Sequence, residues 1–306
     1  MADRTTEAHN LHSSNIDELS AIEIVQLMNR EDANVAVAVG KQAIAIAEAV
    51  DVIANCFRTG GRLFYIGAGT SGRLGVLDAS ECPPTFNSPP GQVIGVIAGG
   101  ERALTQSAEG AEDNPQQSLK DLAEHEFSAA DVLVGIATSG RTPYVLGALE
   151  YARQLGAKTI GFACNEESEL SPKVNIMIAP IVGPEVISGS TRLKAGTATK
   201  MVLNMLTTGA MILIGKTYGN LMVDLRASNS KLRERGVRIV AEVTGLDSVD
   251  ALERLEACGG VVKVAIVSEV AGVDPIEAQR RLQMANGRLK DAIRTPDDRL
   301  TIEEDS

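Results

Sequence analysis

The tetrapeptide Thr-Ser-Gly-Arg occurs twice in this chain, each time after a short apolar run and before a stretch with helical periodicity. The first copy lies in Gly67–Arg73 (GAGTSGR) and the second in Ala137–Pro143 (ATSGRTP). Glycines let a ligand approach the backbone, hydroxyls donate hydrogen bonds, and the start of a helix attracts an anion. One such loop is equally well a tight turn. Two matching loops predict a site for a phosphorylated small molecule.

A third loop of similar composition, Ser188–Arg192 (SGSTR), precedes a helix expected to begin near Lys194. Because ligands of open α/β sheets bind at the carboxyl ends of the strands, we expect all three loops to meet there. The residues predicted to bind the phosphate or the rest of the ligand are Gly69, Thr70, Ser71, Thr138, Ser139, Arg141, Thr142, Ser190 and Lys194.

The first loop also fits the dinucleotide fingerprint Gly-x-Gly-x-x-Gly over residues 67–72. That fingerprint requires an acidic residue about 20 positions later, at the end of the second strand. Here Glu101 comes too late, and the hydroxyl groups suit a phosphomonoester better. Dinucleotide binding is therefore disfavoured.

Few side chains are available for proton transfer near these loops. Of the three histidines, His9 and His12 lie in the N-terminal segment, and His125 lies between two glutamates on an expected solvated helix face. No Cys/His cluster has the spacing of a metal site, so we expect no metal. Carboxylates remain as the candidates for acid–base chemistry.

Two acidic positions stand near the loops. Glu81 lies in Ala79–Thr85 (ASECPPT), where the proline pair is expected to end the helix that follows the first loop. An exposed charge at a helix end is an equally good interpretation of Glu81. Glu112 lies beside Glu109 and Asp113, where a solvated acidic cluster is the simpler interpretation. The spacing of these carboxylates does not choose among them.

These loops require a scaffold, and the sequence predicts a parallel sheet. Short apolar runs alternate with helical stretches, which is typical of strands buried on both faces and joined by helices. The fold class is therefore α/β, a three-layer doubly wound parallel sheet. The predicted strands are Leu63–Ile66, Val93–Ile97, Val132–Ile136, Thr159–Ala163 and Ile176–Ala179.

Four segments are predicted along the chain. Residues 1–56 form an N-terminal arm, loose over about 1–15, followed by helices. Residues 57–220 form the core domain, which carries the loops for the phosphorylated ligand. Residues 221–294 form a small C-terminal domain of three helices, near 248–258, near 261–271 and from Asp274, where Asp, Pro and Glu mark a helix start. Residues 295–306 form an acidic tail without fixed structure.

The composition of the chain indicates which binding partners and which cellular compartment to expect. The chain has 306 residues, with 40 acidic and 29 basic side chains, a net charge of −11. It has no Lys/Arg-rich run, so we expect neither nucleic acid nor a membrane surface as partner. The longest uncharged stretch, Met201–Gly215, is shorter than a membrane span. A polar N-terminus and four scattered cysteines predict a cytoplasmic protein.

Taken together, the motifs resemble those of the N-acetylmuramic acid 6-phosphate etherases, a family built on the sugar-isomerase (SIS) domain. The likeness runs from about residue 14 to residue 294. Ser-Glu-Cys-Pro-Pro-Thr, which contains Glu81, is not shared with SIS isomerases in general. The matching segments are Gly67–Leu74, Asp78–Thr85, Glu109–Asp113, Ser139–Val145, Lys194–Thr197 and Gly219–Asp224.

This resemblance implies a lyase that replaces the D-lactyl ether at C3 of the sugar with a hydroxyl, in amino-sugar recycling. The products are N-acetylglucosamine 6-phosphate and D-lactate. By the resemblance, Glu81 is the proton donor and Glu112 the second catalytic glutamate, and no metal or redox cofactor is required. SIS domains commonly pair, and the helices at 15–56 and 201–215 offer apolar surface, so we expect a homodimer with sites near the interface.

Two alternatives use the same loops. An aldose–ketose isomerase removes the same kind of proton but needs no second acid for a leaving group at C3. A non-catalytic sugar-phosphate-sensing regulator keeps the loops and binds a partner protein.

Overall fold

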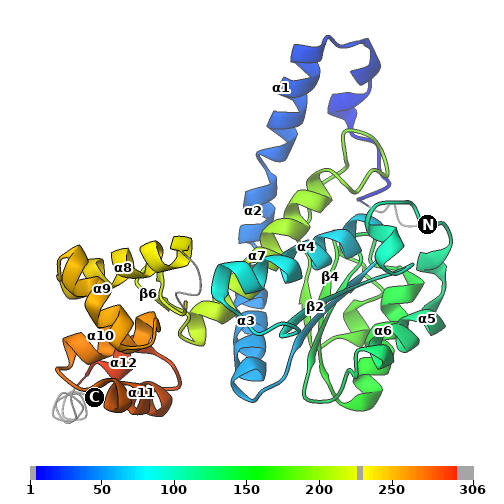
Figure 1. The fold of residues 1–306 in the computed structure, drawn as a ribbon. Helices are drawn as coiled ribbons and strands as arrows, with labels where there is room; N and C mark the ends of the chain where they lie inside the picture. Colours follow the sequence, from blue (N-terminus) through cyan, green and yellow to red (C-terminus); the bar gives the residue numbers. More distant parts are fainter. Residues whose placement is uncertain (1–4, 226–229, 295–306) are drawn as a thin grey trace, which may run out of the picture. The chain divides into compact units, whose positions relative to one another are not determined.

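The computed structural model describes residues 5–225 and 230–294 (Figure 1). These residues form two compact units. One comprises the described residues up to Cys82 together with Pro90–Ala210, and the other comprises Pro83–Pro89 together with the described residues from Met211 onward. The division falls N-terminal to the boundary expected between residues 220 and 221. The predicted tail, 295–306, lies outside the described residues.

Five parallel strands form the sheet of the first unit, in the spatial order β2-β1-β3-β4-β5. Leu63 of the central strand β1 lies opposite Val93 of β2 and Val132 of β3. The five predicted strands are confirmed, and their ends differ from the prediction by at most one residue. Their bounds are β1 Leu63–Gly67, β2 Val93–Ile97, β3 Val132–Ile136, β4 Lys158–Phe162 and β5 Ile176–Ile178.

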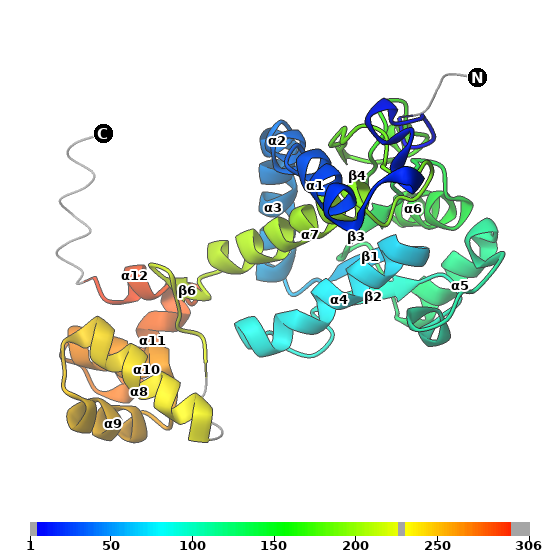
Figure 2. The ribbon, with the colours of Figure 1, turned by 90° about the horizontal axis from the view of Figure 1, so that it is seen from above.

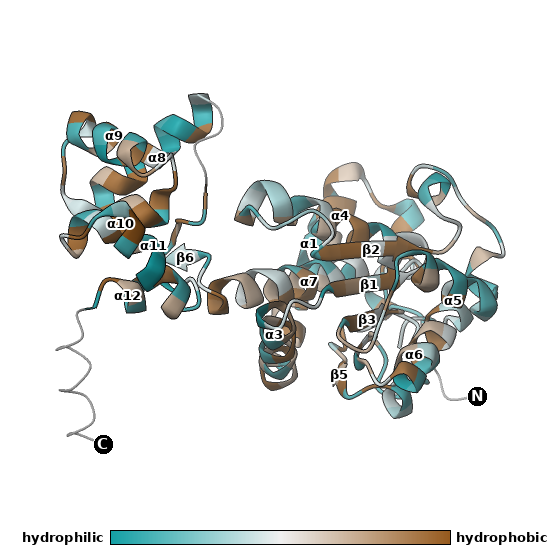
Figure 3. Ribbon diagram, turned by 60° about the horizontal axis from the view of Figure 1, so that its bottom comes forward, coloured by the Kyte–Doolittle hydropathy of each residue, from teal (hydrophilic) through white to brown (hydrophobic). Residues whose placement is uncertain are grey.

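Burial explains why these strands are continuous apolar runs. Every residue of β1 and of β3 is buried, and the strands are mostly brown, that is hydrophobic, in Figure 3. A strand covered on both faces cannot alternate polar and apolar side chains without burying polar groups.

Helices cover both faces of the sheet and make it the middle of three layers (Figures 1 and 2). One face carries α3 (Ala43–Arg58), α4 (Gly69–Phe86) and α7 (Lys194–Leu213), and the other carries α5 (Pro115–Glu124) and α6 (Pro143–Leu155). Two helices, α1 (Ala21–Asp32) and α2 (Val35–Gly40), precede α3. The predicted α/β class with N-terminal helices is confirmed.

A buried polar network fixes α4 against β1 and α7. Asp78 of α4 accepts hydrogen bonds from Tyr65 (2.9 Å), Asn204 (3.2 Å) and Thr207 (3.3 Å). Burial raises the pKa of Asp78, although the hydrogen bonds from Tyr65 and Thr207 oppose that shift. The network sets the position of the helix that begins at the first Thr-Ser-Gly-Arg loop.

The proline pair does not end α4, contrary to the prediction. Pro83 and Pro84 lie inside the helix, which continues to Phe86. A proline removes the hydrogen bond to the carbonyl four residues earlier, which here belongs to Ala79 or Ser80. Ser80 is exposed, so water can solvate its carbonyl, and only two residues follow the pair before the helix ends. The cost of the pair is therefore confined to the last turns.

The N-terminal arm is packed where it is described, which corrects the expectation of a loose segment over 1–15. Thr6 is 1% exposed, and its backbone N–H donates to the side-chain oxygen of Asn165 (3.3 Å). Asn10 donates to the carbonyl of Pro184 (3.2 Å) and to the carboxylate of Glu31 on α1 (2.8 Å). Residues 5–13 are thus fastened to the core by specific hydrogen bonds, which hydropathy does not reveal.

The second unit is mostly helical. The predicted three helices are present as α9 (Ser248–Ala257), α10 (Val262–Val270) and α11 (Pro275–Met284), and α10 supplies more of the buried hydrophobic core than any other helix of this unit. The structure adds a two-stranded hairpin, β6 (Thr217–Tyr218) and β7 (Leu221–Met222), and the helices α8 (Ser230–Thr244) and α12 (Leu289–Ala292). Among the described residues, no helix combines the length and apolar character needed to cross a membrane.

Candidate functional site

The two Thr-Ser-Gly-Arg loops meet at the point where the strand order reverses. From β1 the chain crosses over α4 to β2 on one side, and from β3 it crosses over α6 to β4 on the other. Because the two crossovers leave in opposite directions, a crevice opens between the carboxyl ends of β1 and β3. Gly67 and Ile136, the last residues of these strands, are register partners, so the loops that follow are neighbours.

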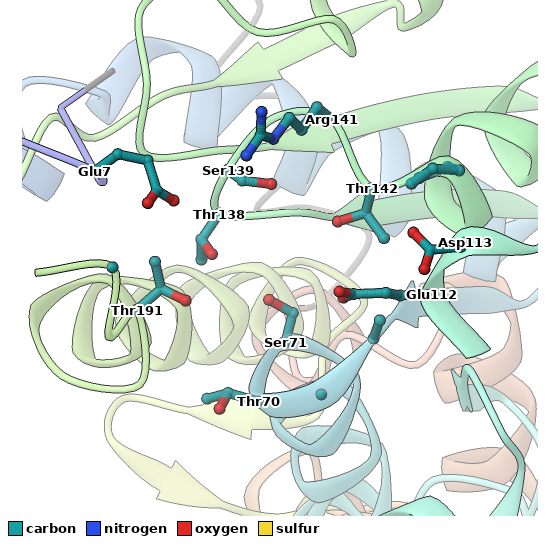
Figure 4. A pocket seen from close by; sticks show the side chains of 14 residues that line it. Glu7, Thr70, Ser71, Glu112, Asp113, Thr138, Ser139, Arg141, Thr142 and Thr191 are labelled. Atoms are coloured by element: carbon teal, nitrogen blue, oxygen red, sulfur yellow. The ribbon is translucent and has the colours of Figure 1, made fainter. Parts of the chain in front are cut away.

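A cavity of about 510 Å³ occupies this crevice (Figure 4). Seven of the nine predicted ligand-binding residues line it, as does Glu112. The structure thus brings together both loops and one of the two expected catalytic carboxylates. The lining residues are Glu7, Ala68, Gly69, Thr70, Ser71, Glu112, Asp113, Thr138, Ser139, Arg141, Thr142, Pro143, Gly189 and Thr191.

The two loops reach the cavity in different ways. Helix α4 begins at Gly69, so Thr70 and Ser71 lie in its first turn. Helix α6 begins only at Pro143, so the second Thr-Ser-Gly-Arg lies ahead of the helix in a turn closed by the hydrogen bond from the Gly140 N–H to the Ala137 carbonyl (2.7 Å). Thr142 precedes α6, and its side chain makes no capping hydrogen bond to the helix. Its hydroxyl can therefore face a ligand.

The arginines of the two loops also differ. Arg141 lines the cavity. Arg73 instead donates hydrogen bonds to the carbonyls of Leu104 (3.0 Å) and Gln106 (3.1 Å). It ties α4 to the segment that leads to Glu112.

Glu112 lies in a short 3-10 turn, Ala111–Asp113, which follows Gly110 in a left-handed conformation (φ +73°). In Figure 4 its carboxylate points toward Ser71 and Thr142. Glu112 also lines a second, adjacent cavity of about 300 Å³, which shares Ala68 and Gly69 with the first. The second cavity is lined largely by alanines, glycines and Arg73. A ligand bound in the first cavity therefore has further space next to Glu112.

The third loop contributes less than the sequence predicts. Gly189 and Thr191 line the cavity, whereas Ser190 does not. Lys194, also predicted to bind the ligand, is 3% exposed, and its ammonium lies 2.7 Å from a carboxylate oxygen of Glu31. An ion pair with a helix 163 residues away in the chain is not readable from the sequence.

The start of α7 is occupied by a carboxylate of the protein itself. Glu185 is 1% exposed and accepts hydrogen bonds from the backbone N–H groups of Lys194 and Ala195 (2.9 Å each). Burial raises the pKa of Glu185, and these two hydrogen bonds partly offset the rise. This helix start is therefore not open to a phosphate, in contrast to the prediction for the third loop.

Glu81 does not line the cavity. It is exposed on α4, twelve residues after Gly69, which corresponds to about 18 Å along the helix. Its position matches the alternative left open by the sequence, a charge near a helix end. Within one chain, the structure does not bring Glu81 and Glu112 together.

Glu7 lines the cavity and was missed by the sequence analysis. It comes from the arm and lies across the cavity from Glu112 and Asp113 (Figure 4). Nothing in the sequence around it marks a site, because the fastening of the arm depends on Asn165, far away in the chain. Among the described residues, no group of three His, Cys, Asp or Glu side chains is placed to hold a metal ion.

Two family models and several curated proteins are similar to this chain. Residues 45–153 match the model of the glucokinase regulatory protein N-terminal SIS domain, and residues 117–209 match that of the SIS domain. The chain is 65% identical over 261 residues to the N-acetylmuramic acid 6-phosphate etherase of Rhodopirellula baltica, covering 85% of this chain and 86% of that protein. It is 56% identical over 260 residues to the same enzyme of Actinobacillus pleuropneumoniae, with 85% and 86% covered.

Among solved structures, the fold is similar to that of a phosphoheptose isomerase from Francisella tularensis. The TM-score is 0.50 at 22% identity, covering 63% of this chain and all of that one. At this identity the likeness concerns the fold alone, and the SIS type of the sheet domain is confirmed by the family model that matches residues 117–209.

Proposed function

The chain belongs to the N-acetylmuramic acid 6-phosphate etherase family, and from that premise we propose that its 510 Å³ cavity cleaves the D-lactyl ether of N-acetylmuramic acid 6-phosphate. The reaction is that of a carbon–oxygen lyase, and it yields N-acetylglucosamine 6-phosphate and D-lactate. The observation that carries the proposal is the meeting of two hydroxyl-rich loops with Glu112 in one cavity. A phosphorylated sugar needs the loops, and proton abstraction needs the carboxylate.

The chemistry follows from the substrate. Opening of the sugar ring exposes an aldehyde at C1, which acidifies the proton at C2. The lactyl oxygen on C3 is then β to the developing carbanion. A base takes the C2 proton, an acid protonates the departing lactate, and water adds to the resulting alkene. Two carboxylates are enough for these steps.

In this scheme Glu112 is the base, and the loops hold the phosphate. The hydroxyls of Ser71, Ser139 and Thr142 supply hydrogen-bond donors, and Arg141 supplies positive charge. The adjacent alanine-lined cavity gives room for a substituent next to C2 or C3.

Glu81 is the proposed proton donor, and we place it in the site of a second copy of the chain. The first unit exposes apolar side chains on its N-terminal helices and also on α4 and α7. A homodimer would bury these side chains. Leu77, one turn before Glu81 on α4, is 50% exposed, and Met205 on α7 is 42% exposed. A dimer that covers this face brings the Glu81 region of one chain against the partner chain. Glu81 could then supply the proton donor that the partner's cavity lacks.

The other proposed attributes follow from the same premise. The partner is a small sugar phosphate, and no metal or redox cofactor takes part. The four cysteines are free and buried, as expected in a reducing compartment, and we place the enzyme in the cytoplasm.

The test is incubation with N-acetylmuramic acid 6-phosphate and assay of D-lactate. Release of lactate is expected, and Glu112→Gln is expected to reduce it by about 10²–10⁴-fold because the amide cannot take a proton. Ketose formation without lactate would identify an isomerase. Binding without turnover would identify a sensing regulator.

Isotopes test the mechanism itself. In heavy water and oxygen-18 water, elimination and hydration place solvent deuterium at C2 and solvent oxygen at C3 of the product. Direct attack on the lactyl carbon leaves both positions unlabelled. Mass spectrometry and NMR of the product distinguish the two routes.

Mixing two inactive variants tests the place of Glu81. If each site combines Glu81 of one chain with Glu112 of the other, unfolding and refolding Glu81→Gln together with Glu112→Gln restores one intact site in each mixed dimer. About a quarter of the wild-type activity is then expected. No recovery in a refolded mixture that contains mixed dimers would place both glutamates in the same chain.

A further inference from the structure

The arm is fastened to the catalytic core on either side of Glu7. On one side, Thr6 is bound to Asn165 through its backbone N–H (3.3 Å) and its hydroxyl (3.1 Å). On the other, Asn10 is bound to the carbonyl of Pro184 and to Glu31. Because both flanks are fixed, the fold sets the position of the Glu7 backbone beside the cavity, from which its exposed side chain extends.

Asn165 couples the arm to the second Thr-Ser-Gly-Arg loop. It is 3% exposed, and its side-chain amide donates to the hydroxyl of Thr6 and also to the backbone carbonyl of Thr138 (3.0 Å). A shift of the loop on ligand binding would therefore be transmitted to the arm. The carboxylate of Glu7 lies against the third loop, since a Cβ added at Gly189 would be 3.3 Å from one of its oxygens.

The carboxylate of Glu7 has no hydrogen-bond or ion-pair partner in residues 5–225 and 230–294, and it faces the cavity (Figure 4). An ionised carboxylate only accepts hydrogen bonds, and it repels a phosphate or another carboxylate. Its complement on a ligand is a neutral donor, namely a hydroxyl or an amide N–H. A sugar phosphate carries such donors at a distance from its anionic group.

We propose that Glu7 is a substrate-binding residue that accepts hydrogen bonds from hydroxyl or amide N–H groups of the sugar. The arm thereby binds the sugar, whereas the loops and Arg141 bind the phosphate. The identity of the sugar, N-acetylmuramic acid 6-phosphate, rests on the proposed function. The preference for a neutral donor rests on the geometry and charge of Glu7 alone.

The test compares two ligands on the full-length protein by calorimetry, N-acetylglucosamine 6-phosphate and inorganic phosphate. Glu7→Ala is expected to weaken binding of the sugar phosphate by roughly tenfold to a hundredfold, as for a lost hydrogen bond to a charged group. The affinity of Glu7→Gln should lie between those of the wild type and Glu7→Ala. Inorganic phosphate is expected to bind equally well or more tightly, because a repelling charge is gone. Glu18→Gln, an exposed glutamate of the same arm outside the cavity, is the matched control and should change neither ligand.

Weaker binding of the sugar phosphate together with unchanged or tighter binding of inorganic phosphate supports the proposal, and retained phosphate binding also shows that the variant is folded. Equal weakening of both ligands would mean that Glu7 only supports the structure, and no change in the sugar phosphate would remove it from the site. Tighter binding of both would mean that it acts through repulsion alone. Each of these results overturns the proposal.

Kinetics provide a second readout. If Glu7 binds ground state and transition state alike, its loss raises KM with little change in kcat. A wild-type protein that releases no lactate would refute the proposed function, while the two-ligand comparison would still decide the role of Glu7.

Discussion

The two Thr-Ser-Gly-Arg loops have the same four residues but different structures. In the first, α4 begins at Gly69, so the tetrapeptide is part of the helix. In the second, α6 begins at Pro143, so the tetrapeptide is a turn that includes Gly140 in a left-handed conformation (φ +76°). Proline is favoured at the first position of a helix, and it sets the later start of α6.

As a consequence, the arginines of the two loops make different contacts. Arg73, one turn into α4, donates to two backbone carbonyls and borders the adjacent 300 Å³ cavity, whereas Arg141, ahead of α6, lines the 510 Å³ cavity. A repeated motif thus predicts where a ligand binds, but the start of the following helix determines what each side chain does.

The largest effect is expected from Gly140→Ala. A Cβ at this position would lie 2.6 Å from Ser168 Oγ and 2.9 Å from Ser168 Cβ, in addition to the unfavourable positive φ. We expect a loss of about 2–4 kcal/mol in the free energy of unfolding, measured with denaturant. In the first loop, Gly69→Ala has a positive φ (+53°) but no atom within 4 Å, and about 1–2 kcal/mol is expected. Equal losses would contradict the tighter packing of the second loop.

The next effect concerns the third loop, where Lys194 is bound to Glu31. Burial opposes ionisation of Glu31, but hydrogen bonds from Lys194, His12 and Asn10 outweigh it and hold its pKa at about 2, below the ordinary 4.5. Because the folded-state pKa is lowered, the stabilisation is present above pH 4.5 and is lost as the pH falls toward 2. Glu31→Gln should cost up to about 3 kcal/mol at pH 7.

The measurement is the unfolding free energy of both proteins between pH 7 and pH 3. The difference between wild type and Glu31→Gln should shrink with acidification. Glu48→Gln, an exposed glutamate of α3, is the control and should change little. A difference that is constant over this range would show that Glu31 does not act through its charge.

The arginine pair gives the most direct comparison. Arg141→Ala should weaken binding of N-acetylglucosamine 6-phosphate by roughly tenfold to a hundredfold, with a change in stability within about 0.5 kcal/mol. Arg73→Ala should instead lower stability by about 1–3 kcal/mol, because two backbone carbonyls lose their donor. Calorimetry measures the affinity of both variants, and denaturant unfolding measures their stability. Equal losses of affinity and of stability in the two variants would contradict the different roles of the arginines.

The serines should give the smallest effect and the most similar one. Ser71→Ala and Ser139→Ala each remove one neutral hydroxyl from the cavity, and we expect affinity for the sugar phosphate to fall roughly two- to tenfold in each. Titration of the single variants measures this. Unchanged affinity in both variants would show that these loops do not bind the phosphate.

The sheet was predictable because its signal is local. Strands buried on both faces must be apolar throughout, and runs such as Leu63–Ile66 and Val132–Ile136 show this directly in the sequence. The two loops were predictable for the same reason, since glycines and hydroxyls between a strand and a helix form one continuous motif.

The features that the sequence does not show depend on contacts between distant residues. The packing of the arm rests on Asn165, and Lys194 forms an ion pair with Glu31. The helix through Pro83 and Pro84 survives because the lost hydrogen bonds fall near its exposed end. The choice of Glu112 over its acidic neighbours depended on the resemblance, because spacing alone left the carboxylates equivalent.

The carboxylate of Glu185 at the start of α7 affects the direction in which a ligand can lie. The proposed substrate is negatively charged at two places, the phosphate and the lactyl group, so a site with equivalent anion pockets at both ends would accept it in either direction. At α7 the side chain of Glu185 already occupies the helix start, whereas the Thr142 side chain leaves the start of α6 uncapped. Of these two helix starts, that of α7 is occupied and that of α6 is uncapped, so we expect the phosphate of a bound substrate to lie toward α6.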